Sequence, residues 1–149
     1  MSNETTNPAS CQTAVSGSAF SIHDLKCGNL LNYDTAEGEI LPTVIDWQDL
    51  KWLTEDPKGF NLVHSGIKLT KEILLSFGFK DEGTHLQLKL SNNWAYEWFD
   101  NLLGFSLCKG NKGVCLGNIQ YVNELQNLHY SFTGEMLPLS LPITNTYAK

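Results

Sequence analysis

The sequence predicts an α+β protein in which antiparallel strands dominate the chain and a helix near its C-terminal end packs on them. Short apolar runs separated by turn residues fill most of residues 20–119. Apolar residues then recur with helical spacing within 118–137, at Tyr121, Leu125, Leu128 and Phe132. Strands and helices do not alternate regularly, which argues against a parallel doubly wound sheet.

The first half of the ordered chain is expected to be rich in β structure. Residues 24–33 lead into a polar turn at 34–38, and 39–46 follow as a second strand, where Pro42 favours an edge position or a bulge. A Gly-Asn pair, an apolar run, a turn and a β-branched strand are how many SH3-like barrels begin, so we expect an SH3-like N-terminal half.

The segment that follows should hold a short helix and then more β structure. Trp47, Leu50 and Leu53 have helical spacing, and Pro57 should stop that helical turn after Asp56. Residues 60–69 return to β character.

A short helix is predicted over 71–77. Thr70 can cap its N-terminus, and Gly78 is placed to end it. Leu69 and Leu74 occupy the two positions of a hydrophobic staple, which fixes how the chain enters a helix.

An antiparallel meander should connect this helix to the last one. Apolar residues alternate over 86–90, a turn follows at 91–93, and the next strand carries Trp94, Tyr96 and Trp98 on one face. A second turn at 100–101 leads into a hairpin formed by 103–108 and 114–119.

The final helix is predicted to be amphipathic and to pack its apolar stripe on the sheet. The stripe consists of the four residues given above, and the polar residues Asn123, Glu124, Gln126 and Asn127 should face water. Gly134 is placed as a left-handed C-terminal cap, and Pro138 discourages a restart.

We therefore expect a single domain over 20–137. Residues 1–19 are mostly small and polar, so we expect a flexible N-terminal arm, and residues 138–149 should form an extended C-terminal tail. A chain of 149 residues can bury enough apolar surface to be stable without metal or disulfide cross-links.

Charge and composition argue against direct nucleic-acid binding. The net charge is −6, all ten basic residues are lysines, and these are scattered along the chain. Arginine is preferred for bidentate contacts to phosphate and guanine, and the sequence has none.

Cysteine spacing and hydropathy favour a cytoplasmic protein. No two of Cys11, Cys27, Cys108 and Cys115 form a C-x-x-C pair, which favours reduced thiols. The first residues carry no secretory signal pattern, and no apolar run approaches the length of a membrane span. We expect no membrane association.

Neither metal binding nor nucleophilic catalysis has a specific signature. Cys108 and Cys115 would flank one hairpin, but zinc sites need further ligands at short spacing, and His129 is distant in sequence. A nucleophilic Cys–His pair could be formed by Cys27 or Cys108 with His23, His64 or His85. Such a pair is recognised by its three-dimensional geometry, which the sequence does not give. We expect no metal, no cofactor and no enzymatic activity.

Carboxylates are concentrated between residues 34 and 56, where seven acids face a single lysine. One interpretation is an acidic surface that meets a basic groove on a partner. Paired carboxylates for hydrolysis are a second, from Glu37 and Glu39 or from Asp46 and Asp49. A solvated face that keeps the chain soluble is the third.

The aromatic stripe of Trp94, Tyr96 and Trp98 also has two interpretations. It is either the buried face of the meander or a platform for a ligand or an interface. Stacking on single-stranded nucleic acid is the poorer use because the net charge is negative.

Three blocks of the sequence resemble a family of small uncharacterised proteins from bacterial prophages and mobile elements. They are DLKCGNLL from Asp24, IKLTKEILLSFGF from Ile67 and YVNELQNLHYSFTGE from Tyr121. The family pattern is close to DLRIGNLV, IPLTEEWLLKFGF and YVHQLQNLYFALTGEEL, and it usually has His where this chain has Asn123. The resemblance covers about residues 22–137 and implies an accessory protein acting in the bacterial cytoplasm.

These observations lead to a functional hypothesis. We expect a non-catalytic protein-binding accessory factor of phage type. Its expected role is that of an anti-CRISPR-like inhibitor of a host defence nuclease. The expected partner is a host or phage protein that handles nucleic acid. The predicted contact residues are Asp46, Trp47, Asp49, Trp52, Glu55 and Asp56. The alternatives are a small-ligand or nucleotide-binding, sponge-like protein that uses the aromatic stripe, and an enzyme built from scattered carboxylates or thiols. Homo-oligomer formation stays open.

Overall fold

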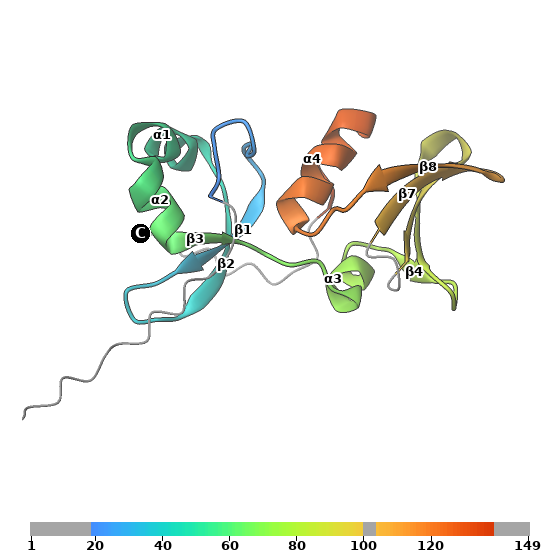
Figure 1. The fold of residues 1–149 in the computed structure, drawn as a ribbon, viewed down its shortest axis with the longest axis horizontal. Helices are drawn as coiled ribbons and strands as arrows, with labels where there is room; N and C mark the ends of the chain where they lie inside the picture. The colour runs from blue at the N-terminus through green and yellow to red at the C-terminus, as the bar shows by residue number, and fades with distance from the viewer. Residues whose placement is uncertain (1–18, 100–103, 139–149) are drawn as a thin grey trace, which may run out of the picture.

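The protein has two antiparallel sheets and four α-helices, as a computed structural model that describes residues 19–99 and 104–138 shows (Figure 1). This confirms the predicted α+β class. The expected arm up to residue 18, the turn at 100–101 and the tail from residue 139 lie outside the described residues.

The first sheet has the strand order β2-β1-β3. Its strands are β1 (Leu30–Asp34), β2 (Ile40–Val44) and β3 (His64–Gly66), and all pairings are antiparallel. Pro42 lies on the edge strand β2, as predicted, where its missing N–H leaves no inner ladder incomplete.

Two helices separate β2 from β3, where we expected one helical turn and a strand. Helix α1 (Trp47–Glu55) ends before Pro57, as predicted, but the chain then forms α2 (Pro57–Val63). The prediction of β structure over 60–69 is thus correct only for the three residues of β3. The N-terminal half is a three-stranded sheet with two helices, and not an SH3-like barrel.

The second sheet is the predicted meander, with the order β4-β5-β6-β7-β8. Its strands are β4 (Lys80–Asp81), β5 (Leu86–Lys89), β6 (Trp94–Phe99), β7 (Gly104–Lys109) and β8 (Lys112–Gly117). A 3-10 turn, η1 (Ser91–Asn93), joins β5 to β6. Helix α3 (Lys71–Ser76) precedes the sheet, and the Thr70 hydroxyl accepts a hydrogen bond from the Ile73 N–H at 3.3 Å, which confirms the predicted cap.

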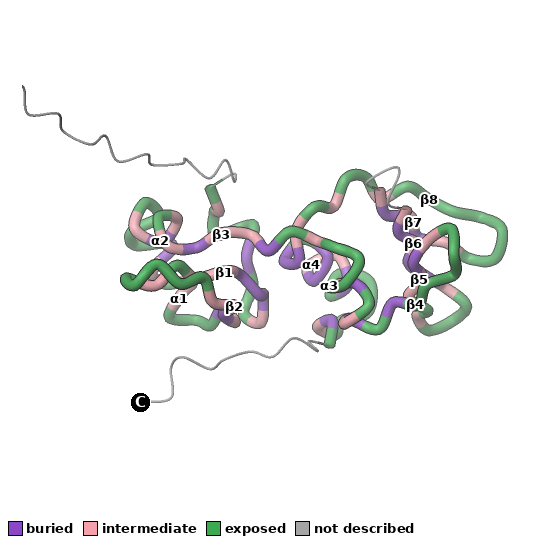
Figure 2. The backbone as a smooth tube through the Cα atoms, turned by 90° about the horizontal axis from the view of Figure 1, so that it is seen from below, coloured by how far each residue is buried: buried purple, intermediate pink, exposed green. Residues whose placement is uncertain are grey.

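Helix α4 (Val122–Thr133) lies with α3 between the two sheets (Figures 1 and 2). Gly134 follows in the left-handed conformation, with φ 76°, which confirms the predicted C-terminal cap. Each sheet therefore packs one face toward these two helices.

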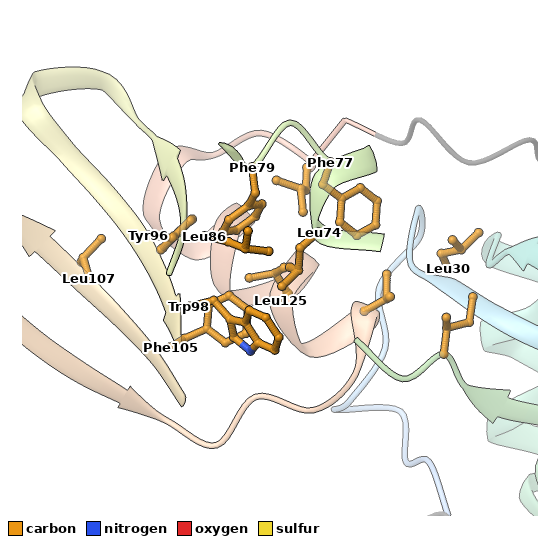
Figure 3. Close-up of a cluster of buried hydrophobic side chains, with 13 residues drawn as sticks. Leu30, Leu74, Phe77, Phe79, Leu86, Tyr96, Trp98, Phe105, Leu107 and Leu125 are labelled. Atoms are coloured by element: carbon orange, nitrogen blue, oxygen red, sulfur yellow. The ribbon is translucent and has the colours of Figure 1, made fainter. Parts of the chain in front are cut away.

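Strand β1 separates two hydrophobic cores because successive side chains of a strand point to opposite faces. Leu31 packs on one face with Ile45, Leu53 and Phe60, beneath α1 and α2. Leu30 faces the other way, into the larger core made by α3, α4 and the meander. Figure 3 shows Leu30 across from Leu125 and Leu74 in this larger core.

The buried stripe of α4 differs from the predicted one. Residues Val122, Asn123, Leu125, Gln126 and His129 are buried, whereas Phe132 is 52 % exposed. The prediction that Asn123 and Gln126 face water was wrong. Gln126 faces inward because its carboxamide pairs with the Leu30 N–H and the Gly28 carbonyl oxygen, backbone groups that need polar partners.

Candidate protein-binding site

The predicted contact residues lie on α1 and at its junction with α2. Asp46 caps α1, because its Oδ1 accepts hydrogen bonds from the N–H groups of Gln48 at 2.7 Å and Asp49 at 3.1 Å. Asp49 Oδ2 in turn accepts from the Asp46 N–H at 3.0 Å. This reciprocal capping box holds both carboxylates at the N-terminal end of the helix, where the helix dipole favours negative charge.

The second pair of acids lies at the other end of α1. Asp56 caps α2, its Oδ1 accepting from the Gly59 N–H at 3.0 Å, with Pro57 at the first helical position. The Glu55 carboxylate lies 3.7 Å from the Lys51 ammonium, and both side chains are largely exposed. A nine-residue helix is about 13 Å long, so the two acidic pairs are separated by about that distance.

The two predicted tryptophans occupy different environments. Trp47 opens α1 with 64 % of its surface exposed. Trp52 is half-buried, and its ring lies edge-on to Phe60 and to His64, each at a centroid distance of 5.6 Å. Trp52 therefore belongs mainly to the smaller core, and of the two tryptophans only Trp47 is exposed.

An exposed leucine that the sequence analysis missed lies on α2. Leu62 is 80 % exposed, although it belongs to an apolar-rich stretch. The sequence analysis did not identify Leu62 as exposed because it predicted β structure over 60–69. The Asp56-Pro57 pair, an N-cap followed by proline, was the signal that could have identified α2.

We define the acidic helical surface as five exposed side chains of α1, α2 and their caps together with the half-buried Asp49: Asp46, Trp47, Asp49, Glu55, Asp56 and Leu62. Residues 34–63 carry seven of the sixteen acidic residues but only two of the ten lysines. The negative charge of the protein is therefore concentrated in residues 34–63, which include this surface.

His64 lies behind this surface, in the smaller core. Its ring stacks on Phe60 at a centroid distance of 3.9 Å, and its Nδ1 is 3.0 Å from the Phe60 carbonyl oxygen. Burial lowers the pKa of His64, against the opposing effects of that hydrogen bond and of Asp49. His64 therefore packs as a neutral ring at neutral pH.

The aromatic stripe belongs to the core, which corrects its interpretation as an open platform. Tyr96 is fully buried and Trp98 is 7 % exposed, with Phe105 and Leu86 packed around them (Figure 3). Burial raises the pKa of Tyr96 to about 12. Trp94 is half-buried, with the Lys109 ammonium 5.4 Å from its ring centroid.

Cys108 is poorly suited to act as a nucleophile. Cys108 Sγ donates a hydrogen bond to Glu97 Oε2 at 3.3 Å, and burial together with this carboxylate raises the pKa of the thiol to about 11. At neutral pH it is protonated and weakly nucleophilic. Among residues 19–99 and 104–138, no group of three or more His, Cys, Asp or Glu side chains could hold a metal ion.

Comparisons with protein-family models, curated proteins and solved structures find no match to this chain. The resemblance to prophage and mobile-element proteins stays a prediction. In the part of the chain that the structure describes, no helix has the length and apolar character needed to cross a membrane.

Proposed function

We propose that this protein is a non-catalytic binding factor whose acidic helical surface occupies a basic groove on a partner protein. The observation that carries the proposal is the exposure of Trp47 between carboxylates, with Leu62 on the adjacent helix. Tryptophan is among the residues most often found at the energetic centres of interfaces. A large exposed aromatic ring beside the capping carboxylates of Asp46 and Asp49 suits a partner of opposite charge.

The most fitting partner is a protein that itself binds nucleic acid. Such proteins carry basic grooves, and a folded acidic surface can compete for them by mimicking the negative charge of the phosphate backbone. With the resemblance to prophage proteins, this favours a host defence nuclease as the partner. The protein would act by occupying the groove and would carry out no chemistry.

The test is affinity purification of the tagged protein from a bacterial lysate at about 50 and about 300 mM salt, followed by mass spectrometry. We expect a stoichiometric, nucleic-acid-handling partner whose retention falls as salt rises. The recovered partner is then purified, and its affinity is measured against variants of the acidic helical surface.

The variants must remove charge without removing the helix caps. Asp46→Asn and Asp56→Asn keep a capping oxygen, and Glu55→Gln keeps the shape of the side chain. We expect this triple variant to bind at least about tenfold more weakly and to lose much of its salt dependence. A matched control carries Glu72→Gln, Glu82→Gln and Glu135→Gln, three exposed acids outside residues 34–63.

Trp47→Ala tests the aromatic anchor separately. It should weaken binding by about tenfold or more, while Phe132→Ala, which removes a similarly exposed ring from α4, should leave affinity unchanged. Equal affinity of the triple variant and its control, with no effect of Trp47→Ala, would overturn the proposal.

A further inference from the structure

A cavity of about 450 Å³ lies where the N-terminal end of α4 meets the segment before β1 and strand β3. Its volume is in the range of sites that take small molecules or single side chains of a partner, roughly 300–1,000 Å³. It is distinct from the acidic helical surface, so an inference about it stands whether or not that surface binds a partner.

One wall of the cavity contains an unpartnered polar group. The Asn123 side chain lines the cavity and is only 3 % exposed, and its Oδ1 accepts no hydrogen bond. A buried acceptor without a donor is unfavourable, because it has lost its hydrogen bond to water and gained none in return. This amide oxygen is therefore a vacant acceptor for a ligand that donates hydrogen bonds.

Two carboxylates line the same cavity. Glu124 uses Oε2 to accept from the N–H groups of Gln120 at 2.8 Å and Tyr121 at 3.1 Å, so the capping role engages one carboxylate oxygen. Asp24 uses Oδ2 to accept from the Ser21 N–H at 2.7 Å. The lining contains one histidine, His23, and no lysine, so the two carboxylates make the cavity better suited to a cation than to phosphate.

Hydrogen bonds to α4 hold Asp24 in place at the cavity wall. Asn127 Nδ2 donates to the Asp24 carbonyl oxygen at 2.9 Å, and Asn127 Oδ1 accepts from Asn29 Nδ2 at 3.1 Å. The amide group and the oxygen of Asn127 thus both tie the segment before β1 to the helix. The acceptors of the cavity are positioned by the fold before any ligand arrives.

Aromatic rings line the cavity as well, and both are held in place. The Tyr121 ring lies so close to Gly66 that a Cβ there would be 2.6 Å from a ring carbon. The Phe20 side chain packs partly against the smaller core, and Asn61 of α2 holds the Phe20 backbone by accepting from its N–H at 2.6 Å and donating to its carbonyl oxygen at 3.1 Å. Ring faces attract cations, and planar cations can also stack on them.

We propose that this cavity binds a guanidinium group. A guanidinium is a planar cation with five hydrogen-bond donors and no acceptor, which matches a site with two carboxylates, a vacant amide oxygen and fixed aromatic rings. An ammonium is compact and strongly hydrated, so it would use the rings and the spread of acceptors less well. The chain contains no arginine, so the group must come from another molecule.

The group has two chemical sources, an arginine side chain of a polypeptide or a free guanidino compound. Titration calorimetry on the full chain should therefore compare N-acetyl-arginine amide with butylguanidine, which has the same single charge but lacks the peptide-like groups. Tighter binding of the blocked arginine assigns the site to a protein ligand, and tighter binding of butylguanidine assigns it to a small molecule.

The matched control ligands are N-acetyl-citrulline amide and N-acetyl-lysine amide. Citrulline keeps the shape of arginine without its charge, and lysine keeps the charge without the planar fork. We expect each to bind at least about tenfold more weakly than the arginine compound. If the citrulline compound binds equally well, the site does not require a positive charge. If the lysine compound binds equally well, the site does not prefer a guanidinium group.

Variants locate the ligand within the molecule. Asp24→Asn and Glu124→Gln retain acceptors for their backbone partners, and each should weaken binding about tenfold. Glu135→Gln removes an exposed acid just beyond the opposite end of α4 and should change nothing. Asn123→Leu should also weaken binding, and its thermal midpoint shows whether it folds. No saturable binding of either guanidinium probe, or unchanged affinity in both carboxylate variants, would overturn the proposal.

Discussion

The side-chain oxygen of Gln126 on α4 accepts a hydrogen bond from the backbone N–H of Leu30 on β1, at 2.8 Å. The same carboxamide donates through Nε2 to the Gly28 carbonyl oxygen at 3.2 Å. Gln126 is fully buried, and it serves two backbone groups of a segment that lies about a hundred residues earlier in the chain. A glutamine thus takes the place of a neighbouring strand at the start of β1.

Replacing Gln126 by leucine should destabilise the fold by about 2 kcal/mol. The new side chain is similar in size but leaves the Leu30 N–H without its partner. Urea denaturation monitored by tryptophan fluorescence measures the effect. Gln48→Leu, at an exposed position of α1, should change the free energy of unfolding by less than about 0.5 kcal/mol. Equal stability of the two variants would contradict the role assigned to Gln126.

Thr70→Ala should cost about 1 kcal/mol, because it removes the oxygen that accepts from the Ile73 N–H at the start of α3. Thr54→Ala provides the comparison. The Thr54 hydroxyl donates to the Leu50 carbonyl oxygen inside α1, where alanine is the better helix former. Thermal unfolding should show a lower midpoint for the first variant only. A lower midpoint for Thr54→Ala alone would contradict the assignment.

Stability should fall as the pH drops below about 6.5, in part because of His64. Burial holds the pKa of His64 below its usual value of 6.5, so the unfolded chain takes up a proton at a higher pH than the folded protein does. The free energy of unfolding is therefore lost progressively from that value down to the lowered pKa of the folded state. His129 has the same direction of shift, with burial as the main cause.

His64→Phe isolates the contribution of His64 because it keeps an aromatic ring against Phe60 and removes the titrating group. Urea denaturation of both proteins at about pH 7.5 and about pH 5.5 gives two losses of stability to compare. The wild type should lose more free energy of unfolding than the variant, since all other titrating groups are shared. Equal losses would show that protonation of His64 is not coupled to folding.

Cys108 should react more slowly with iodoacetamide than Cys27 and Cys115, which are both exposed. Its pKa of about 11 leaves little thiolate at about pH 8, and the thiol is partly covered. Peptide mapping by mass spectrometry after a short pulse under native conditions resolves each site. Glu97→Gln removes the carboxylate that accepts from the thiol, so labelling of Cys108 should accelerate. Early, complete labelling of Cys108 in the wild type would contradict this picture.

Elements with local signals could be predicted from the sequence. The cap at Thr70 and the ending at Gly78 defined α3, and alternating leucines followed by turn residues defined the meander. The residues that set these elements lie within a few positions of each other, so no knowledge of the tertiary structure was needed. Helix α2 was missed because its apolar residues, Phe60, Leu62 and Val63, lack helical periodicity.

The buried polar residues of α4 could not be predicted in the same way. Gln126 faces inward because its partners are backbone groups of β1, and nothing near Gln126 in sequence announces them. The candidate site, too, could be predicted only in part from the sequence. The concentration of acids was visible in the sequence, but the burial of Trp52 and the exposure of Leu62 depend on how α1 and α2 pack. The cavity combines segments around residues 24, 66 and 123, so only the fold reveals it.

The position of α4 between the sheets has a consequence for synthesis on the ribosome. Leu30 is among the first core residues to be made, whereas Leu125 and Leu137 of the same core are among the last. The smaller core around Leu31 can close once Phe60 has emerged, while the Leu30 face of the same sheet remains uncovered. Until Leu125 and Leu137 have been made, the nascent chain therefore presents a sheet with one uncovered apolar face, the kind of surface that chaperones recognise.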